Sequence, residues 1–384
     1  MTVANTAPSL STTKLIGLLG DTHGDLEHLS IVSQTMWARG VSVLLVLGDF
    51  GFLWPGHNWS KDLDRLNRRL GERDQVLYWV DGNHEDFATL YSKFPVSEDG
   101  LRRLRPNIIH LPRGYRAPLA FGRTLAVLGG ANSIDAHRRA LGSTWWLEEQ
   151  ISDDDLEKLG HEHAEVMLGH DAPVPLPVLD ASLATTDHYW PTEMLAYAAA
   201  GRQKFMDGFL QVRPSLYFGG HFHQFIDETV TYGEGENTFE TRVMLLGLNA
   251  SNTLSQAVLN LQNLEVEAFA RNDTTVTRLT GAESGIWQVH TRDSIHLFDL
   301  DLGLVERRPG PNALLPNVKD VRSLRTIKVC AVGERGFWTF PSDDASADYL
   351  WTFSSTIERI ERVQRDRSKP AKEHTPDERG HGED

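Results

Sequence analysis

Short apolar runs alternate with helix-like segments over the first ninety residues. The runs at 14–20, 41–47 and 75–80 are almost entirely apolar, and each ends in a turn that contains Gly and Asp. Segments of helical character at about 26–38 and 59–70 separate them. Continuous apolar strands that alternate with helices are typical of βαβ units and of a sheet buried on both faces.

The pattern of apolar residues in the remainder of the chain predicts further strands and a second domain. The runs AEVMLGHD and PSLYFGGH again end in polar residues, residues 193–210 between them predict a helix, and 226–270 predict more strands. After a polar boundary at about 271–284, period-two alternation predicts a small, mostly β domain over 283–364. We therefore expect one domain over 14–270 and a β-rich accessory domain after it.

The terminal segments differ in composition from the rest of the chain. Residues 365–384 contain few apolar side chains and are expected to be disordered. The N-terminal segment lacks the positive and apolar regions of a signal peptide, and no apolar run is long enough to span a membrane. We expect a cytoplasmic protein without membrane partners.

Five apolar runs share one feature, which is that each ends in Gly followed by potential metal ligands. They are Gly20-Asp21-Thr22-His23, Gly48-Asp49, Gly82-Asn83-His84-Glu85, Gly169-His170-Asp171 and Gly220-His221-Phe222-His223. The carboxyl ends of strands in open α/β sheets converge on one crevice, so these side chains are expected to meet. Carboxylate, amide and imidazole ligands suit borderline divalent ions. We expect two ions, with manganese favoured over iron or zinc.

The ordered motifs GDTHGD, GDFG, GNHE, GHD and GGHFH resemble the calcineurin-like metallophosphoesterase superfamily over about residues 14–270. The resemblance implies an α/β fold with a β-sandwich flanked by helices. It also implies seven metal ligands: Asp21, His23, Asp49, Asn83, His170, His221 and His223. Asp49 would bridge the two ions. His84 would lie beside the scissile phosphate.

The implied chemistry is hydrolysis of a phosphate ester by a hydroxide that bridges two ions. His84 is the candidate to assist the leaving group, and Asp81 or Glu85 is the candidate to orient its imidazole; Asp81 is equally able to cap a turn. The second motif reads GDFGFLWPG and lacks the Asp-Arg pair of the protein Ser/Thr phosphatases and diadenosine tetraphosphatases. The chain looks more like a bacterial and phage branch of small phosphoesterases.

Substrate contacts are suggested by a local basic cluster. Residues 101–140 hold eight Arg and one Asp. Arg138 and Arg139 are candidates for phosphate binding, because a guanidinium can hold two oxygens. Trp145 and Trp146 are candidates for stacking on a base or ring, although one member of such a pair is commonly packed in the core.

The net charge of the chain limits the substrate classes that are expected. The chain carries −15 at pH 7, which argues against a long nucleic acid as partner. A phosphodiester of a small nucleotide is the first hypothesis, because the Trp pair and the Arg cluster favour a nucleotide. A nuclease, a phosphoprotein phosphatase and a non-catalytic scaffold of the same fold are the alternatives. The accessory domain is expected to bind a protein partner or to mediate oligomerisation.

Overall fold

The computed structural model divides the chain into two compact units, Met1–Asp273 and Thr274–Asp384. It describes residues 8–56, 58–249, 254–270, 275–283, 285–310, 320–342 and 348–363. The expected disordered tail lies outside this described part, and the proposed domain limits stay a prediction. No helix among the described residues combines the length and apolar character that a membrane crossing requires.

The first unit contains a seven-stranded sheet in the order β13-β12-β1-β2-β3-β5-β4. Its strands are β1 (Leu15–Leu19), β2 (Val43–Leu47), β3 (Val76–Val80), β4 (Arg102–Arg105), β5 (Ile108–His110), β12 (Gln256–Asn260) and β13 (Val266–Phe269). Strands β1, β2, β3 and β5 are parallel, whereas β12 runs antiparallel to β1. Every residue of β1, β2 and β3 is buried, which explains their continuous apolar runs.

A six-stranded second sheet follows the order β10-β11-β9-β8-β7-β6. Its strands are β6 (Arg116–Pro118), β7 (Thr124–Leu128), β8 (Val166–Gly169), β9 (Leu216–Gly219), β10 (Ile226–Tyr232) and β11 (Phe239–Leu245). Strands β7, β8, β9 and β11 are parallel to one another. Both sheets therefore have a parallel centre and antiparallel edges.

The two sheets pack face to face. One core cluster combines Leu18 and Leu45 of the first sheet with Val127, Leu168 and Phe218 of the second. A separate cluster on the other face of the second sheet holds side chains from the helices that cover it. The predicted class, an α/β sandwich flanked by helices with a small β domain, is confirmed.

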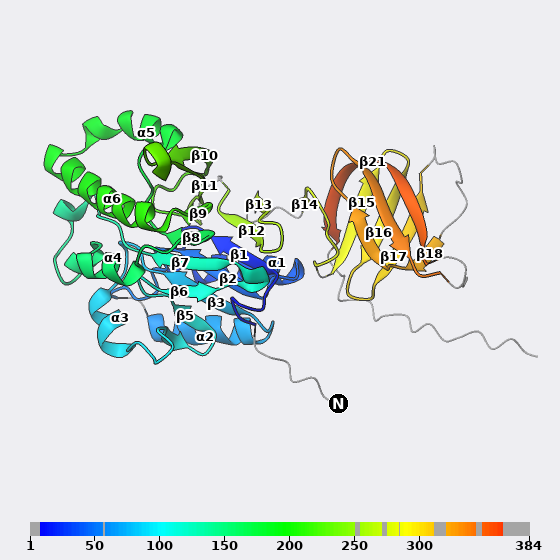
Figure 1. Ribbon diagram of the computed structural model, residues 1–384. Coiled ribbons are helices and arrows are strands. Elements are labelled where there is room, and N and C mark those ends of the chain that lie inside the picture. The colour runs from blue at the N-terminus through cyan, green and yellow to red at the C-terminus, as the bar shows by residue number, and fades with distance from the viewer. Residues whose placement is uncertain are drawn as a thin grey trace, which may run out of the picture. The chain divides into compact units, whose positions relative to one another are not determined.

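Six α-helices accompany the two sheets in the described residues, and Figure 1 shows α5 and α6 on the side of the second sheet. They are α1 (Leu26–Ala38), α2 (Trp59–Gly71), α3 (Phe87–Lys93), α4 (Asp153–Leu159), α5 (Pro177–Ala184) and α6 (Thr192–Val212). The first begins where the Asp25 side chain accepts from the backbone N–H of His28, a typical N-cap. The predicted helices at 26–38, 59–70 and 193–210 are confirmed within two residues at each end.

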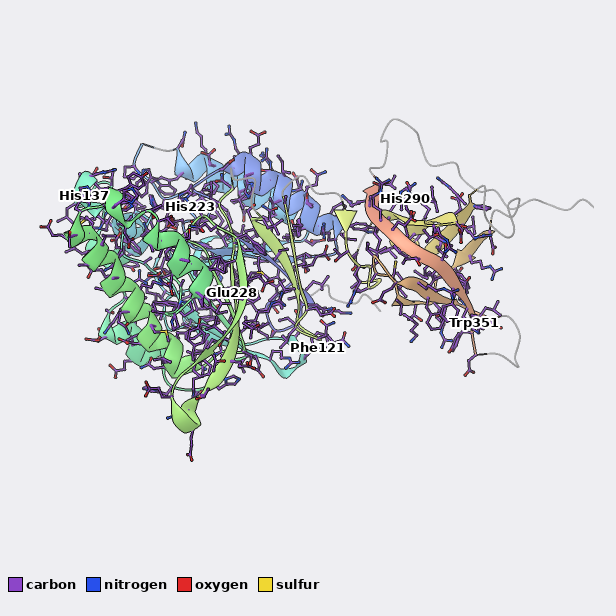
Figure 2. The ribbon with its side chains drawn as sticks, turned by 90° about the horizontal axis from the view of Figure 1, so that it is seen from above. Phe121, His137, His223, Glu228, His290 and Trp351 are labelled. Carbon is purple, nitrogen blue, oxygen red and sulfur yellow. The ribbon has the colours of Figure 1, made fainter. Side chains whose placement is uncertain are left out.

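The second unit is an antiparallel sheet in the order β18-β17-β16-β15-β21-β20-β19, and β14 also pairs with β21. The strands are β14 (Thr275–Val276), β15 (Ile286–Thr291), β16 (Ser294–Asp299), β17 (Leu304–Pro309), β18 (Asp320–Ser323), β19 (Thr326–Val329), β20 (Arg335–Phe340) and β21 (Leu350–Val363). Alternate residues of β15 and β16 are buried, as their period-two pattern predicts. Trp287, Phe298 and Trp338 are fully buried and form the centre of its own core. Figure 2 labels His290 on β15 and Trp351 on β21 of this sheet.

Candidate metal centre

The potential ligands follow directly on parallel strands of both sheets. Asp21 comes two residues after β1 and Asp49 two residues after β2, whereas His170 follows β8 immediately and His221 comes two residues after β9. Parallel strands present their carboxyl ends at one edge, so the fold brings these residues together. Asn83 comes from the corresponding turn after β3.

The glycines of these turns are required by close packing. A Cβ atom at Gly48 would lie 2.0 Å from Nδ1 of His170, and one at Gly82 would lie 2.2 Å from Oδ1 of Asp49. A Cβ atom at Gly220 would lie 2.1 Å from Oδ1 of Asp21. Each glycine therefore makes room for a ligand carried by another strand. This packing gives a physical reason for glycine in three of the five motifs, those at Gly48, Gly82 and Gly220.

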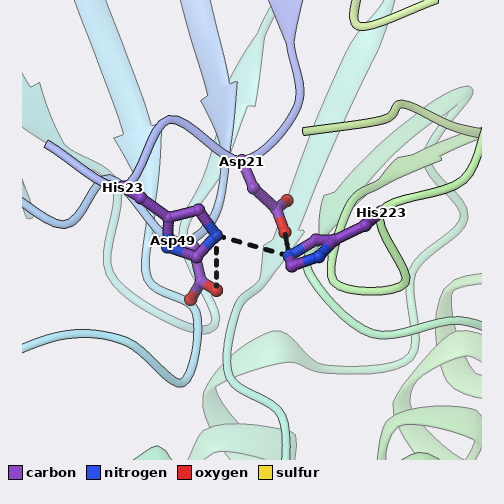
Figure 3. A group of neighbouring side chains, drawn as sticks. All are labelled: Asp21, His23, Asp49 and His223. Carbon is purple, nitrogen blue, oxygen red and sulfur yellow. Dashed lines mark hydrogen bonds and ion pairs between the residues drawn. The ribbon is translucent and has the colours of Figure 1, made fainter. Parts of the chain in front are cut away.

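Asp21, His23, Asp49 and His223 form one group, whose potential ligand atoms all lie within 4.8 Å of one another (Figure 3). Nε2 of His223 lies 3.1 Å from Oδ2 of Asp21 and 3.3 Å from Nε2 of His23. His23, Asp49 and His223 have backbone φ angles of 45°, 47° and 55°. Positive φ is unfavourable for such residues, so the surrounding structure holds these side chains in place.

A second group contains Asn83, His170 and His221. Oδ1 of Asn83 lies 3.1 Å from Nε2 of His170 and 3.0 Å from Nδ1 of His221. Asp49 lies between the two groups, because its Oδ1 is 3.3 Å from Nε2 of His170 and its Oδ2 is 3.9 Å from Nε2 of His23. All seven residues predicted as ligands are thus brought to one place, and Asp49 faces both sides.

The donor set fits borderline divalent metal ions. Oδ2 of Asp21 is buried without a hydrogen-bond partner, although Nε2 of His223 is 3.1 Å away. The nitrogens and oxygens of the first group thus lie close around a common point. Mixed imidazole and carboxylate ligands without cysteine suit manganese, iron or zinc. The four residues of the first group would hold one ion, and Asn83, His170 and His221 would hold another with Asp49.

Residues outside the ligand set orient the ligands. Nδ2 of Asn83 donates to Oγ of Ser133 over 2.9 Å, and that hydroxyl donates to Oε2 of the buried Glu149 over 2.5 Å. The amide oxygen of Asn83 is thereby directed at the two histidines. Burial raises the pKa of Glu149 even though Ser133 bonds to its carboxylate. Such supporting hydrogen bonds fix ligand geometry in metal sites.

Backbone groups complete the support. The amide of His84 donates to Oδ1 of Asp49 over 2.8 Å, and the amide of His221 donates to Oδ1 of Asp21 over 3.0 Å. Nδ1 of His170 lies 2.8 Å from the carbonyl oxygen of Leu47, which leaves Nε2 directed at Asp49. Ser133, Glu149 and these backbone contacts were not among the sequence predictions, because nothing in their spacing relates them to the ligands.

Buried charges shift the protonation of this site. Burial opposes ionisation of Asp49, but nearby His170 and His84 outweigh it, so the pKa of Asp49 lies well below its usual value. Burial also disfavours the charged form of His170, yet Asp49 and then Asp21 raise its pKa to about 10. Burial, followed by the charge of His170, lowers the pKa of His221. A protonated imidazole cannot bind a metal, so His170 could serve as a ligand only in its neutral form.

His84 stands beside the ligand groups and contacts an arginine. Its Nε2 lies 2.6 Å from Nη2 of Arg139, which also pairs with Asp135 at 2.8 Å. The indole of Trp54 stacks on the His84 ring with centroids 5.7 Å apart. Burial lowers the pKa of His84, and Arg139 contributes to the shift. The structure thus brings His84 and Arg139 together. It also places Trp54 in the site, a residue that the sequence indicated only by its position in GFLW, close to Asp49.

The two carboxylates expected to orient His84 make other contacts. Asp81 accepts from Nε of Arg113 over 2.7 Å and contacts His110 at 3.1 Å, while Glu85 accepts from the amides of Phe50 and Gly51. No hydrogen bond among the described residues places either carboxylate against His84. Both carboxylates hold neighbouring segments of the chain, and the catalytic role of Asp81 stays a prediction.

The remaining predicted substrate residues lie in different environments. Trp146 is buried and meets the edge of Trp54 at 5.7 Å, whereas Trp145 lies 6.3 Å from the ring of Tyr197. The guanidinium of Arg138 lies 5.1 Å over the ring of Trp190. Their roles in substrate binding stay predictions.

Two sheets whose strand ends bring together seven potential ligands define a metallohydrolase-type α/β domain. Residues 14–225, more than half of the chain, match the family model described as calcineurin-like phosphoesterase. The chain therefore belongs to the calcineurin-like phosphoesterase family, whose members are typically metal-dependent hydrolases.

Solved structures give a weaker likeness. The crystal structure of TT1561 from Thermus thermophilus is 13% identical, with a TM-score of 0.43, and the match covers 68% of this chain and all of that one. A second solved chain is 12% identical, with a TM-score of 0.38, and the match covers 67% of this chain and 99% of that one. No curated protein matches the sequence.

Proposed function

We propose that the protein hydrolyses a phosphodiester, with a small nucleotide as the favoured substrate, at a centre of two divalent metal ions. The observation that carries this proposal is the position of Asp49, whose two carboxylate oxygens face the two ligand groups at 3.3 Å and 3.9 Å. A carboxylate so placed can serve two ions at once. When bound, such ions would neutralise charge on the phosphoryl group and lower the pKa of water.

Arg139 and His84 are placed to act on the ester itself. Arg139 carries an Nη1 that is buried without a hydrogen-bond partner, and its Nη2 reaches His84. A phosphoryl oxygen at this point would accept from the guanidinium, as charge-assisted hydrogen bonds favour. Nε2 of His84 would then be free to interact with the leaving oxygen. Trp54 packs against His84 and limits the orientations of its ring.

Metal analysis tests the core of this proposal. Protein loaded with Mn²⁺ and freed of excess metal should contain two ions per chain. Simultaneous replacement of Asn83 and His221 should reduce the content to one, because the first group keeps all its ligands. A wild-type content of zero would contradict the proposal.

A substrate screen tests the finer assignment. The Mn²⁺-loaded protein should hydrolyse small nucleotide phosphodiesters faster than single-stranded DNA, RNA or phosphopeptides. Faster cleavage of a polynucleotide would favour a nuclease, and faster release from a phosphopeptide would favour a protein phosphatase. Protein that binds both ions but cleaves none of these would fit a scaffold that has kept its metal site.

A further inference from the structure

A pocket of about 580 Å³ opens beside the candidate metal centre. Its walls come from α5, α6 and the turns after β7, β8 and β9. His221, one of the ligand residues, forms part of the wall together with Asp171 and Phe222. Ligand sites commonly have volumes of about 300–1,000 Å³. The pocket is therefore large enough for an organic group and shares a wall with the metal centre.

The helix α6 makes one side of the pocket mainly apolar. Leu195, Ala198, Ala199 and Arg202 line it, and their spacing of three and four residues places them on one face of the helix. Two of the four are alanines, whose short side chains leave space in front of the helix. Leu183 of α5 is also part of the lining. A flat or branched apolar group can thus contact both helices.

The charges in the pocket disfavour an anionic occupant. Asp171, Asp180 and Asp187 belong to the lining, and Arg202 is its only described lysine or arginine. Nη1 of Arg202 donates to Oδ1 of Asp180 over 2.7 Å, and its Nη2 donates to the carbonyl oxygen of Pro173 over 2.8 Å. The one cation is thereby committed to the protein. A second phosphate in the pocket would meet these carboxylates, and the one arginine of the lining already pairs with Asp180.

Two aromatic rings supply flat contact surfaces. Trp190 and Phe222 line the pocket. The guanidinium of Arg202 lies 5.8 Å from the Phe222 ring, and that of Arg138 lies 5.1 Å from the Trp190 ring. Aromatic walls favour stacking with planar apolar groups. Arg138 is thus associated with the pocket, whereas Arg139 is associated with His84.

We propose that this pocket receives the organic group of the ester, and that this group is uncharged, mainly apolar and ring-sized. The assignment rests on the phosphoesterase function proposed above. With phosphorus at the metal centre, the group would extend past His221 between α5 and α6. The chemistry suits an aromatic or aliphatic alcohol, or a nucleobase. It excludes polyphosphates and nucleic-acid strands, whose neighbouring phosphates would enter an acidic pocket.

Binding of an uncharged ring tests the pocket independently of catalysis. Calorimetry with 2-naphthol on the full-length, metal-loaded protein should detect binding to the wild type. Ala198→Phe fills the pocket from α6, and Thr186→Trp, at an exposed position on the rim, fills it from the opposite wall. Each variant should weaken binding about tenfold or more, which corresponds to the binding free energy gained by burying one ring. The matched control Ala200→Phe, on an exposed α6 position outside the lining, should leave affinity unchanged. Wild-type affinity in both filled variants would overturn the proposal.

Hydrolysis of three diesters separates this proposal from the proposed function. Each carries one p-nitrophenyl group, and the second group is methyl, 2-naphthyl or 6-sulfo-2-naphthyl. The wild type should show the lowest KM for the 2-naphthyl diester, and Ala198→Phe should raise that KM more than the KM of the methyl diester. Equal KM values for the two naphthyl diesters would overturn the requirement for an uncharged group. Inactivity on all three, with 2-naphthol binding intact, would refute the phosphoesterase function and leave the pocket assignment standing.

Discussion

The two units of the chain place their polar residues in opposite ways. In the first unit, central strands run parallel and are buried throughout, so polar side chains collect in the turns at one edge. In the second unit, strands run antiparallel, and polar residues alternate along each strand. Successive antiparallel strands end at opposite edges, which disperses their turns. The comparison shows that strand direction decides whether the polar residues at the strand ends lie at the same edge of the sheet and can form one site.

Loss of the shared ligand should break the first unit's function most completely. Asp49→Asn keeps the size of the side chain but removes the charge that faces both ligand groups. We expect kcat to fall by more than ~10³-fold, beyond the ~10²–10³-fold typical of losing one stabilising group. The partly exposed His223 provides the control, because His223→Gln removes an outer ligand of one group and should retain more activity. Near-normal turnover of Asp49→Asn at saturating Mn²⁺ would refute the shared-ligand assignment.

His84 should affect rate more than metal content. His84→Ala removes a group beside the ligands, and general acid–base assistance is typically worth ~10²–10⁴-fold in rate. We expect a loss of that size with both ions retained, measured by turnover and elemental analysis together. The loss should shrink for an ester with an activated aryl leaving group. A loss that is the same for good and poor leaving groups would indicate a positioning role.

The buried ion pair behind the site should matter for stability. Arg113 and Asp81 are almost fully buried, and Nη2 of Arg113 lies 2.6 Å from Oδ2 of Asp81. Arg113→Met would remove the arginine partner of the buried Asp81 and leave it only the contact with His110, and breaking such a buried pair typically costs about 3–5 kcal/mol. The partly exposed pair of Arg242 and Asp227 is the matched control, and Arg242→Met should cost less than about 1 kcal/mol. Urea unfolding measures both; similar costs would contradict the buried-pair argument.

A histidine in the second unit should make that unit sensitive to acid. Burial, with a smaller effect of Arg307, lowers the pKa of His296 to about 4. Because its folded-state pKa lies below the unfolded value of about 6.5, stability is complete above pH 6.5 and declines as the pH falls toward 4. The decline has an upper bound of about 3 kcal/mol. It should be largely absent in His296→Gln and retained in the control His290→Gln. Unfolding of the second unit, followed through its buried tryptophans between pH 7 and 4, tests this; identical acid sensitivity in His296→Gln would refute it.

Removal of the second unit should have the smallest effect on chemistry. All potential ligands lie between Asp21 and His223, and the first compact unit ends at Asp273. A chain that ends at Arg271 should bind metal and hydrolyse an activated aryl phosphodiester within about twofold of the full chain, since compact domains commonly fold alone. A soluble, metal-loaded truncated protein without activity would show that the second unit shapes the active site.

The sequence by itself indicated where the central strands lie along the chain and which potential ligands follow them. Continuous apolar runs ending in Gly and a ligand type predicted β1, β2, β3, β8 and β9 and the residues that follow them. These signals are local, because burial on both faces and a tight turn leave a direct trace in neighbouring residues. Alternation beyond residue 283 predicted the second unit for the same reason.

Only the tertiary structure decided which residues surround the ligands. The pairing of Asp81 with Arg113, the support of Asn83 by Ser133, and the contact of Arg139 with His84 join residues 32, 50 and 55 positions apart. The pocket beside His221 likewise depends on how α5 and α6 lie over the second sheet. Such contacts are set by the packing of whole elements, which leaves no periodic signal in one sequence. The kind of site could therefore be read from the chain, whereas its supporting contacts and the space beside it could not.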